Sequence, residues 1–144
     1  MPVPPLAEWR ERWTNKDAQR LGVRPDNVAD GFARFWVDFP WGDERDEDED
    51  FLNHALAYAV DIAALAAVIS HLDPEREQPN GTAALHLNFL EPPSGPIAVE
   101  ARVVHWHVPA ALVELVATDT EGRQIARGLS PYSLRARTAE RPPV

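Results

Sequence analysis

The sequence of 144 residues predicts a single α+β domain in which an antiparallel sheet wraps around one long central helix. Residues 53–72 are rich in alanine and leucine and are apolar on nearly every side, which is typical of a buried helix. Four strand-like segments follow this helix, and short turns separate them. Enclosing the helix in one sheet is the most economical way to remove it from water. Residues 1–144 contain no internal repeat that would indicate a second domain.

One helix and one strand are predicted before the central helix. Residues 5–21 are amphipathic, with leucine and tryptophan on one face and charged side chains on the other. Residues 30–39 are aromatic and partly alternating, so we expect a strand that ends at Pro40. Residues 42–50 are strongly acidic and are expected to form a solvated loop.

The second half of the chain predicts an antiparallel meander. A polar loop over residues 74–81 separates the central helix from the first strand of this part. Alternating or continuous apolar runs then predict strands over 82–91, 97–107, 111–118 and 124–134. We expect the polar tail after residue 136 to be mobile.

Composition and charge exclude several classes of function. The formal net charge of −9 would repel a phosphate backbone, so nucleic acid is not an expected partner. The chain has no cysteine, which excludes disulfides and thiolate chemistry and is consistent with the cytoplasm. Its N-terminus lacks the pattern of a signal peptide. The central apolar run, interrupted by Asp61, is too short to span a membrane, so we expect a cytoplasmic protein without a membrane partner.

Asp61 is the most informative residue of the chain because it stands alone in the middle of the apolar helix. Burying an ionised carboxylate without partners costs several kcal/mol. Asp61 is therefore either a paired structural residue or the working group of a site, and we favour a site. At about 100° per residue, His54 and Tyr58 fall on the same side of the helix as Asp61.

Several segments resemble the hotdog fold, in which a curved sheet wraps a central helix. Residues 82–92 match a strand of the form Thr-x-x-Leu-x-x-Asn-Phe-x-x-Pro, and Asp119 begins an Asp-x-x-Gly turn. These strands resemble those of thioesterases of the phenylacetate-pathway type. The helix, with His54-Ala-Leu-Ala-Tyr-Ala-Val-Asp61, resembles that of type II acyl-CoA thioesterases. The resemblance covers approximately residues 20–135.

This resemblance implies an acyl-CoA thioesterase in which coenzyme A enters as part of the substrate and no separate cofactor is needed. Asp61 would act as general base or nucleophile, and Thr82 would position water or substrate. Backbone amides near the expected helix start would bind the oxyanion. The other candidate residues are a catalytic His54 and the substrate-binding or oxyanion-binding Asn53, Tyr58 and Ser130. The resemblance also implies a homodimer or homotetramer.

Two features depart from the family pattern and leave other functions open. The family's His-Gly-Gly is replaced by Leu52-Asn53-His54, and its glutamine position falls on or near Ser130. A non-catalytic hotdog protein that binds an acyl or aromatic ligand, or serves as an assembly subunit, is therefore an alternative. A hydratase or dehydratase that pairs Asp61 with His54 is a third. No metal site is predicted, because His105 and His107 have no identified third ligand.

Overall fold

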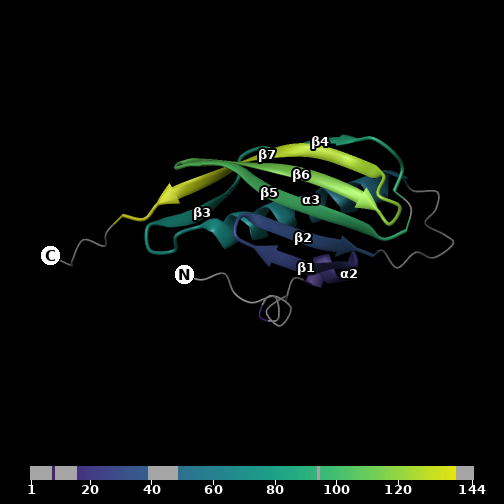
Figure 1. Cartoon of the computed structure of the whole chain (residues 1–144), viewed down its shortest axis with the longest axis horizontal. Coiled ribbons are helices and arrows are strands. Elements are labelled where there is room, and N and C mark those ends of the chain that lie inside the picture. Colours follow the sequence, from purple (N-terminus) through teal and green to yellow (C-terminus); the bar gives the residue numbers. More distant parts are fainter. Residues whose placement is uncertain (1–7, 9–15, 39–48, 94, 139–144) are drawn as a thin grey trace.

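The computed structural model describes residues 8, 16–38, 49–93 and 95–138, and their side chains except those of residues 49–52. A seven-stranded antiparallel sheet curls around the central helix α3 (Glu49–His71), as Figure 1 shows. The strand order is β1-β2-β5-β6-β7-β3, and β4 also pairs with β7. This architecture confirms the predicted α+β fold.

The sheet consists of strands that all pair with antiparallel neighbours. Their bounds are β1 Val23–Ala29, β2 Phe32–Val37, β3 Glu77–Thr82, β4 His86–Phe89, β5 Ile97–His107, β6 Ala110–Asp119 and β7 Gln124–Ala136. The short helix α2 (Lys16–Arg20) precedes β1. The last three predicted strands agree with β5, β6 and β7 to within two residues at each end.

Three other predicted elements differ from the structure. The expected strand over 30–39 is the second half of a hairpin, and its first half, β1, was not predicted. The expected strand over 82–91 contains the last residue of β3 and the whole of the shorter strand β4, while most of the predicted loop over 74–81 forms the rest of β3. The central helix begins at Glu49, four residues before the predicted start.

Two further predictions fall largely outside the described residues. Of the amphipathic helix expected over residues 5–21, the structure describes helix only at residue 8 and over Lys16–Arg20. Most of the acidic loop expected over 42–50 and most of the tail after residue 136 are not among the described residues.

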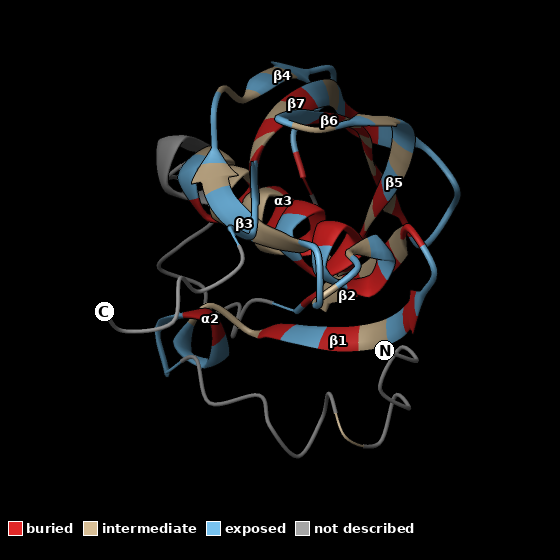
Figure 2. Ribbon diagram, turned by 90° about the vertical axis from the view of Figure 1, so that its left-hand side faces the viewer, coloured by how far each residue is buried: buried red, intermediate tan, exposed pale blue. Residues whose placement is uncertain are grey.

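The core lies between α3 and the inner face of the sheet, where Figure 2 colours one side of the helix as buried. α3 packs chiefly against β5 and β2. Alanines on this side of α3 allow a close approach, and larger side chains of the strands, such as Phe35, Val99 and Leu115, fill the remaining space. The buried alanines of the helix are Ala55, Ala59, Ala63, Ala64, Ala66 and Ala67.

Ser70 fixes the C-terminal end of α3 to the turn between β1 and β2. Its buried hydroxyl accepts a hydrogen bond from the Gly31 amide at 3.0 Å and lies 2.5 Å from the Ala29 carbonyl oxygen. Gly31 has a positive φ of 72°, a conformation that glycine adopts without strain. The hydroxyl of Ser70 is therefore fully used in holding the helix against the sheet.

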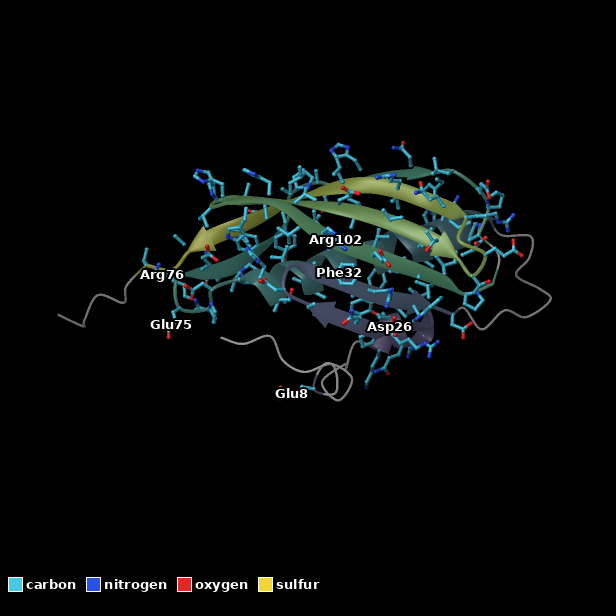
Figure 3. All side chains as sticks on the ribbon, in the orientation of Figure 1. Glu8, Asp26, Phe32, Glu75, Arg76 and Arg102 are labelled. Carbon is cyan, nitrogen blue, oxygen red and sulfur yellow. The ribbon has the colours of Figure 1, made fainter. Side chains whose placement is uncertain are left out.

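The outer face of the sheet carries charged side chains. Arg102 lies over the Phe32 ring at 4.8 Å from its centroid, and Figure 3 labels both residues. Arg34 donates a hydrogen bond to Asp26 at 2.7 Å, and this bond is the largest cause of the raised pKa of the guanidinium. These contacts lie on β1, β2 and β5, at the opposite end of the strand order from β3.

Within the part of the chain that the structure describes, one segment is long and apolar enough to cross a membrane. It is Asn53–His71 of α3, with a mean hydropathy of 1.4. The helix is longer than the sequence predicted, so its length alone does not exclude a membrane span. Since 56% of the segment is buried inside the protein, it has the character of a core helix.

Candidate active site

Asp61 and Thr82 are in direct contact on the side of α3 that the sheet leaves uncovered. The Thr82 hydroxyl donates a hydrogen bond to Asp61 Oδ1 over 2.7 Å. Asp61 lies in the middle of α3, and Thr82 is the last residue of β3. The structure thus joins two residues that the sequence singled out from separate segments.

Asp61 is half-buried and not fully buried, which corrects the expectation of an enclosed carboxylate. It belongs to a row of residues that share one side of α3, as their spacing of three or four residues requires. We call this row, which consists of His54, Tyr58, Asp61, Leu65 and Ile69, the uncovered stripe. Leu65 and Ile69 are 37% and 39% exposed. Asp61 therefore stands on an apolar surface that a substrate can reach.

Tyr132 of β7 is a third polar residue near this carboxylate, and the sequence analysis missed it. Tyr132 pairs directly with Thr82 in the register of β3 and β7, and it is only 4% exposed. Burial raises the pKa of its phenol, and the negative charge of Asp61 raises it further. The phenol consequently keeps its proton at neutral pH and can act as a hydrogen-bond donor.

Ser130 lies two residues before Tyr132 on the same inner face of β7. It is completely buried, and its hydroxyl donates a hydrogen bond to the Ala84 carbonyl at 3.0 Å. Ala84 belongs to the break between β3 and β4, where the amides of Ala83 and Ala84 both bond to the Pro131 carbonyl. Ser130 thereby helps to fix the end of β3 that carries Thr82.

The remaining candidates lie on the first half of α3. Asn53 and Tyr58 are half-buried, and His54 is exposed. Because the helix begins at Glu49, the backbone amides of Asn53 and His54 fall in its second turn. Amides at that depth bond to carbonyls of the helix itself, whereas the free amides of a helix lie in its first turn. The oxyanion-binding amides expected near Asn53 and His54 are therefore already engaged.

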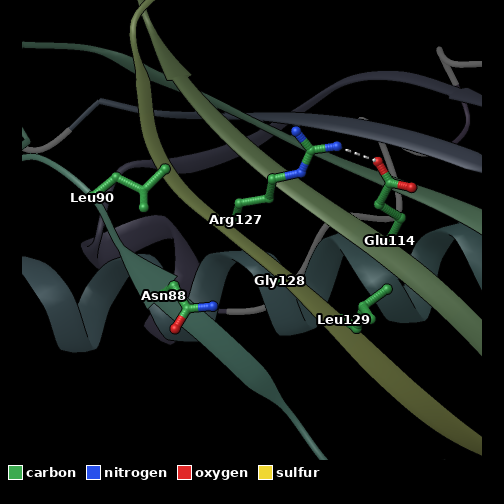
Figure 4. A pocket seen from close by; sticks show the side chains of 6 residues that line it. All are labelled: Asn88, Leu90, Glu114, Arg127, Gly128 and Leu129. Carbon is green, nitrogen blue, oxygen red and sulfur yellow. Dashed lines mark hydrogen bonds and ion pairs between the residues drawn. The ribbon is translucent and has the colours of Figure 1, made fainter.

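A hollow of about 440 Å³ lies on the outer face of the sheet and is shown in Figure 4. Arg127 and Glu114 form an ion pair of 3.2 Å beside it. A side chain at Gly128 would collide with the His86 carbonyl, so the close pairing of β4 with β7 requires glycine there. Arg127 and Leu129 alternate with the inward-facing Ser130 along β7, so this hollow is separate from Asp61.

No group of three or more histidine, aspartate or glutamate side chains that could hold a metal occurs among the described residues. The described side chains around Asp61 supply a carboxylate, an aliphatic hydroxyl and a phenol. A carboxylate can accept a proton from water, and neutral hydroxyls can donate hydrogen bonds to a developing negative charge.

Comparisons with solved structures show what this chain resembles. It matches PA5026 of Pseudomonas aeruginosa, described as a probable thioesterase, with a TM-score of 0.77 and 24% identity over 95% of this chain and 99% of that one. It matches the Haemophilus influenzae thioesterase HI1161 with a TM-score of 0.72 and 13% identity, covering 91% and 90% of the two chains. No family model and no curated protein sequence matches the chain.

A further match is the Escherichia coli protein PaaI from the phenylacetic acid degradation operon. Its TM-score is 0.60 and its identity 18%, over 81% of this chain and 86% of that one. These similarities, together with the sheet that curls around α3, establish the hotdog fold for this chain. The resemblance identified in the sequence is thus confirmed at the level of the fold.

Proposed function

We propose that the protein is a thioester hydrolase that cleaves acyl-CoA, with Asp61 as its central catalytic group. The observation that carries this proposal is the hydrogen bond of 2.7 Å from Thr82 to Asp61 on the accessible side of α3. Two solved structures of the same fold, PA5026 and HI1161, are named as a probable thioesterase and a thioesterase. We also propose that the protein is soluble and acts in the cytoplasm.

In the proposed reaction, Asp61 accepts a proton from water while the water oxygen attacks the thioester carbon. The carbonyl electron pair moves onto its oxygen, and collapse of this intermediate breaks the carbon–sulfur bond. The proton held by Asp61 then passes to the departing thiolate, which leaves as free coenzyme A. Because Thr82 donates to Oδ1, the second carboxylate oxygen of Asp61 would accept the proton of the water. Direct attack by Asp61 on the thioester is the alternative route.

The other predicted site residues have supporting roles in this proposal. Tyr58 and Asn53 lie on or beside the uncovered stripe and would contact the acyl group or the pantetheine arm. The exposed His54 would assist proton transfer at the stripe's outer end. Ser130 would act indirectly, because its hydroxyl is bonded to Ala84 near the Thr82 end of β3.

We also propose that a second copy of the chain packs against the uncovered stripe of α3 and forms an interface there. Leu65 and Ile69 are large apolar side chains exposed on the same side of α3 as Asp61. Covering them would bury apolar surface and exclude water from around the carboxylate, which strengthens its interactions with a substrate. A homodimer or homotetramer therefore fits both the surface and the proposed chemistry.

The proposal is tested by measuring thiol release from a panel of acyl-CoA substrates. The wild-type protein should release free thiol from at least one substrate, and Asp61→Asn should lower kcat at least 100-fold, because the amide cannot accept the proton. Asp26→Asn is a matched control, since Asp26 is another hydrogen-bonded carboxylate but lies on the opposite edge strand, β1. Full activity in Asp61→Asn would refute the assignment.

A further inference from the structure

The Tyr132 hydroxyl is a buried donor whose role is not explained by the packing of the core. Tyr132 is 4% exposed. No described residue forms a hydrogen bond with its phenol, although the neighbouring inner-face hydroxyl of Ser130 is bonded to Ala84. Buried hydroxyls almost always have a partner, because leaving one unpaired costs about 1–3 kcal/mol. Among the described residues, the Tyr132 phenol is therefore available to donate a hydrogen bond to a molecule that binds beside it.

The position of Tyr132 indicates where that molecule binds. Tyr132 lies directly across from Thr82 in the pairing of β7 with β3, and Thr82 holds Asp61 at 2.7 Å. The charge of Asp61 acts on the phenol and contributes to its raised pKa. The Tyr132 hydroxyl and the Asp61 carboxylate thus face the same small region, the one as a donor and the other as an acceptor.

The chemistry of thioester cleavage requires both kinds of group in one place. Negative charge develops on the carbonyl oxygen during attack, and a donor held in a poorly solvated position stabilises that charge strongly. The amides of Asn53 and His54 lie in the second turn of α3 and are engaged by the helix. A side-chain donor on the sheet would supply the hydrogen bond to the carbonyl oxygen that those amides cannot supply.

We propose that the Tyr132 hydroxyl is a catalytic oxyanion donor, which binds the thioester carbonyl oxygen as Asp61 takes the proton of the attacking water. This inference rests on the proposed function. The water oxygen bonds to the carbonyl carbon, the carbonyl electron pair moves to the oxygen that Tyr132 holds, and the pair returns as the carbon–sulfur bond breaks. Tyr132 keeps its own proton throughout, and Asp61 passes the proton it received to the leaving thiolate.

The test compares two buried hydroxyls, one of which has hydrogen-bond partners among the described residues while the other has none. Tyr132→Phe removes a hydroxyl that has no hydrogen-bond partner among the described residues, so the melting temperature should be unchanged or slightly raised. Its kcat should fall about 100-fold with little change in KM, as when one oxyanion donor is lost. Ser70→Ala removes a fully bonded hydroxyl at the end of α3, so it should lower the melting temperature and leave kcat unchanged. Wild-type kcat in Tyr132→Phe would overturn the inference while leaving the hydrolase assignment intact.

A binding measurement separates failure of this inference from failure of the proposed function. The probe is a ketone analogue of acyl-CoA in which a methylene replaces the thioester sulfur, so that the carbonyl remains but cannot be cleaved. Calorimetry should find binding to Tyr132→Phe about tenfold weaker than to the wild type. If the wild type binds acyl-CoA without turnover, the hydrolase assignment fails, the catalytic role of Tyr132 fails with it, and this ratio decides only whether Tyr132 binds the carbonyl oxygen. Equal affinity, or no binding to the wild type, would overturn the inference.

Discussion

Replacing Thr82 tests whether its hydrogen bond to Asp61 organises the site. Thr82→Val preserves the shape and the branched side chain that suit a strand, but it removes the hydroxyl that donates to Asp61 Oδ1. Thr82→Ser retains the hydroxyl and removes only a methyl group. The two variants therefore differ in the donor more than in the packing of β3.

The expected magnitude follows from the contact itself. A hydrogen bond to a charged group contributes about 1.5–3 kcal/mol. Thr82 is exposed and Asp61 half-buried, so water partly replaces the lost donor and the lower end of that range applies. Since 1.36 kcal/mol corresponds to a tenfold change in rate, we expect kcat/KM of Thr82→Val to fall about tenfold. Thr82→Ser should remain within about twofold of the wild type.

The assay is thiol release from the best substrate, measured for the wild type, both Thr82 variants, Asp61→Asn and the double variant Asp61→Asn/Thr82→Val. If Thr82 acts through Asp61, its replacement should cost nothing further once the carboxylate is gone. Two results would refute the reasoning. The first is wild-type activity in Thr82→Val, and the second is a double variant whose loss equals the sum of the two single losses in free energy.

Two further predictions concern association and pH. Leu65→Glu places a charge on the exposed part of the uncovered stripe, so light scattering should find a shift to monomer with loss of activity; an unchanged mass would contradict the proposed interface. Asp119 is nearly buried at the β6–β7 turn; burial alone would raise its pKa, but hydrogen bonds from Arg123 and Glu121 lower it below 3.8. Asp119→Asn should therefore lower the melting temperature above pH 3.8, with the difference from the wild type shrinking as the pH falls through the folded pKa. A difference that is constant with pH would exclude this charge effect.

The sequence predicted well those helices and strands that lie against the core, because burial requires them to be apolar on at least one face. The central helix is recognisable because the side that packs against the sheet is almost entirely apolar. β5 and β6 are recognisable as apolar or alternating runs because one face of each lies in the core. Asp61 was selected by the same logic, as the one charge that this burial does not explain. The structure brings Asp61 into hydrogen-bond contact with Thr82, and the roles of both residues in catalysis remain predictions.

The strands that the sequence analysis missed, β1 and β3, lie at the two ends of the strand order, and β3 shares its edge with β4. Both contain a proline next to a shift in register, Pro25 in β1 and Pro79 in β3. An edge strand tolerates proline and polar residues because one side of its backbone has no partner within the sheet. The composition of these strands therefore resembles that of loops, and only the pairing with a neighbour makes them strands.

The failure to predict β3 also explains why Tyr132 was overlooked. Alternation along β7 already places Tyr132 on the same face as Ser130, which the sequence analysis did select. What the sequence did not indicate was the partner, since residues 77–81 were assigned to a loop and Thr82 to the start of the following strand, so no pairing of Thr82 with Tyr132 was expected. Once β3 is recognised as an edge strand, its register places Tyr132 opposite the residue that holds Asp61. The edge strand β3 therefore connects Asp61 on α3, which the sequence predicted, with Tyr132 on β7, which it did not.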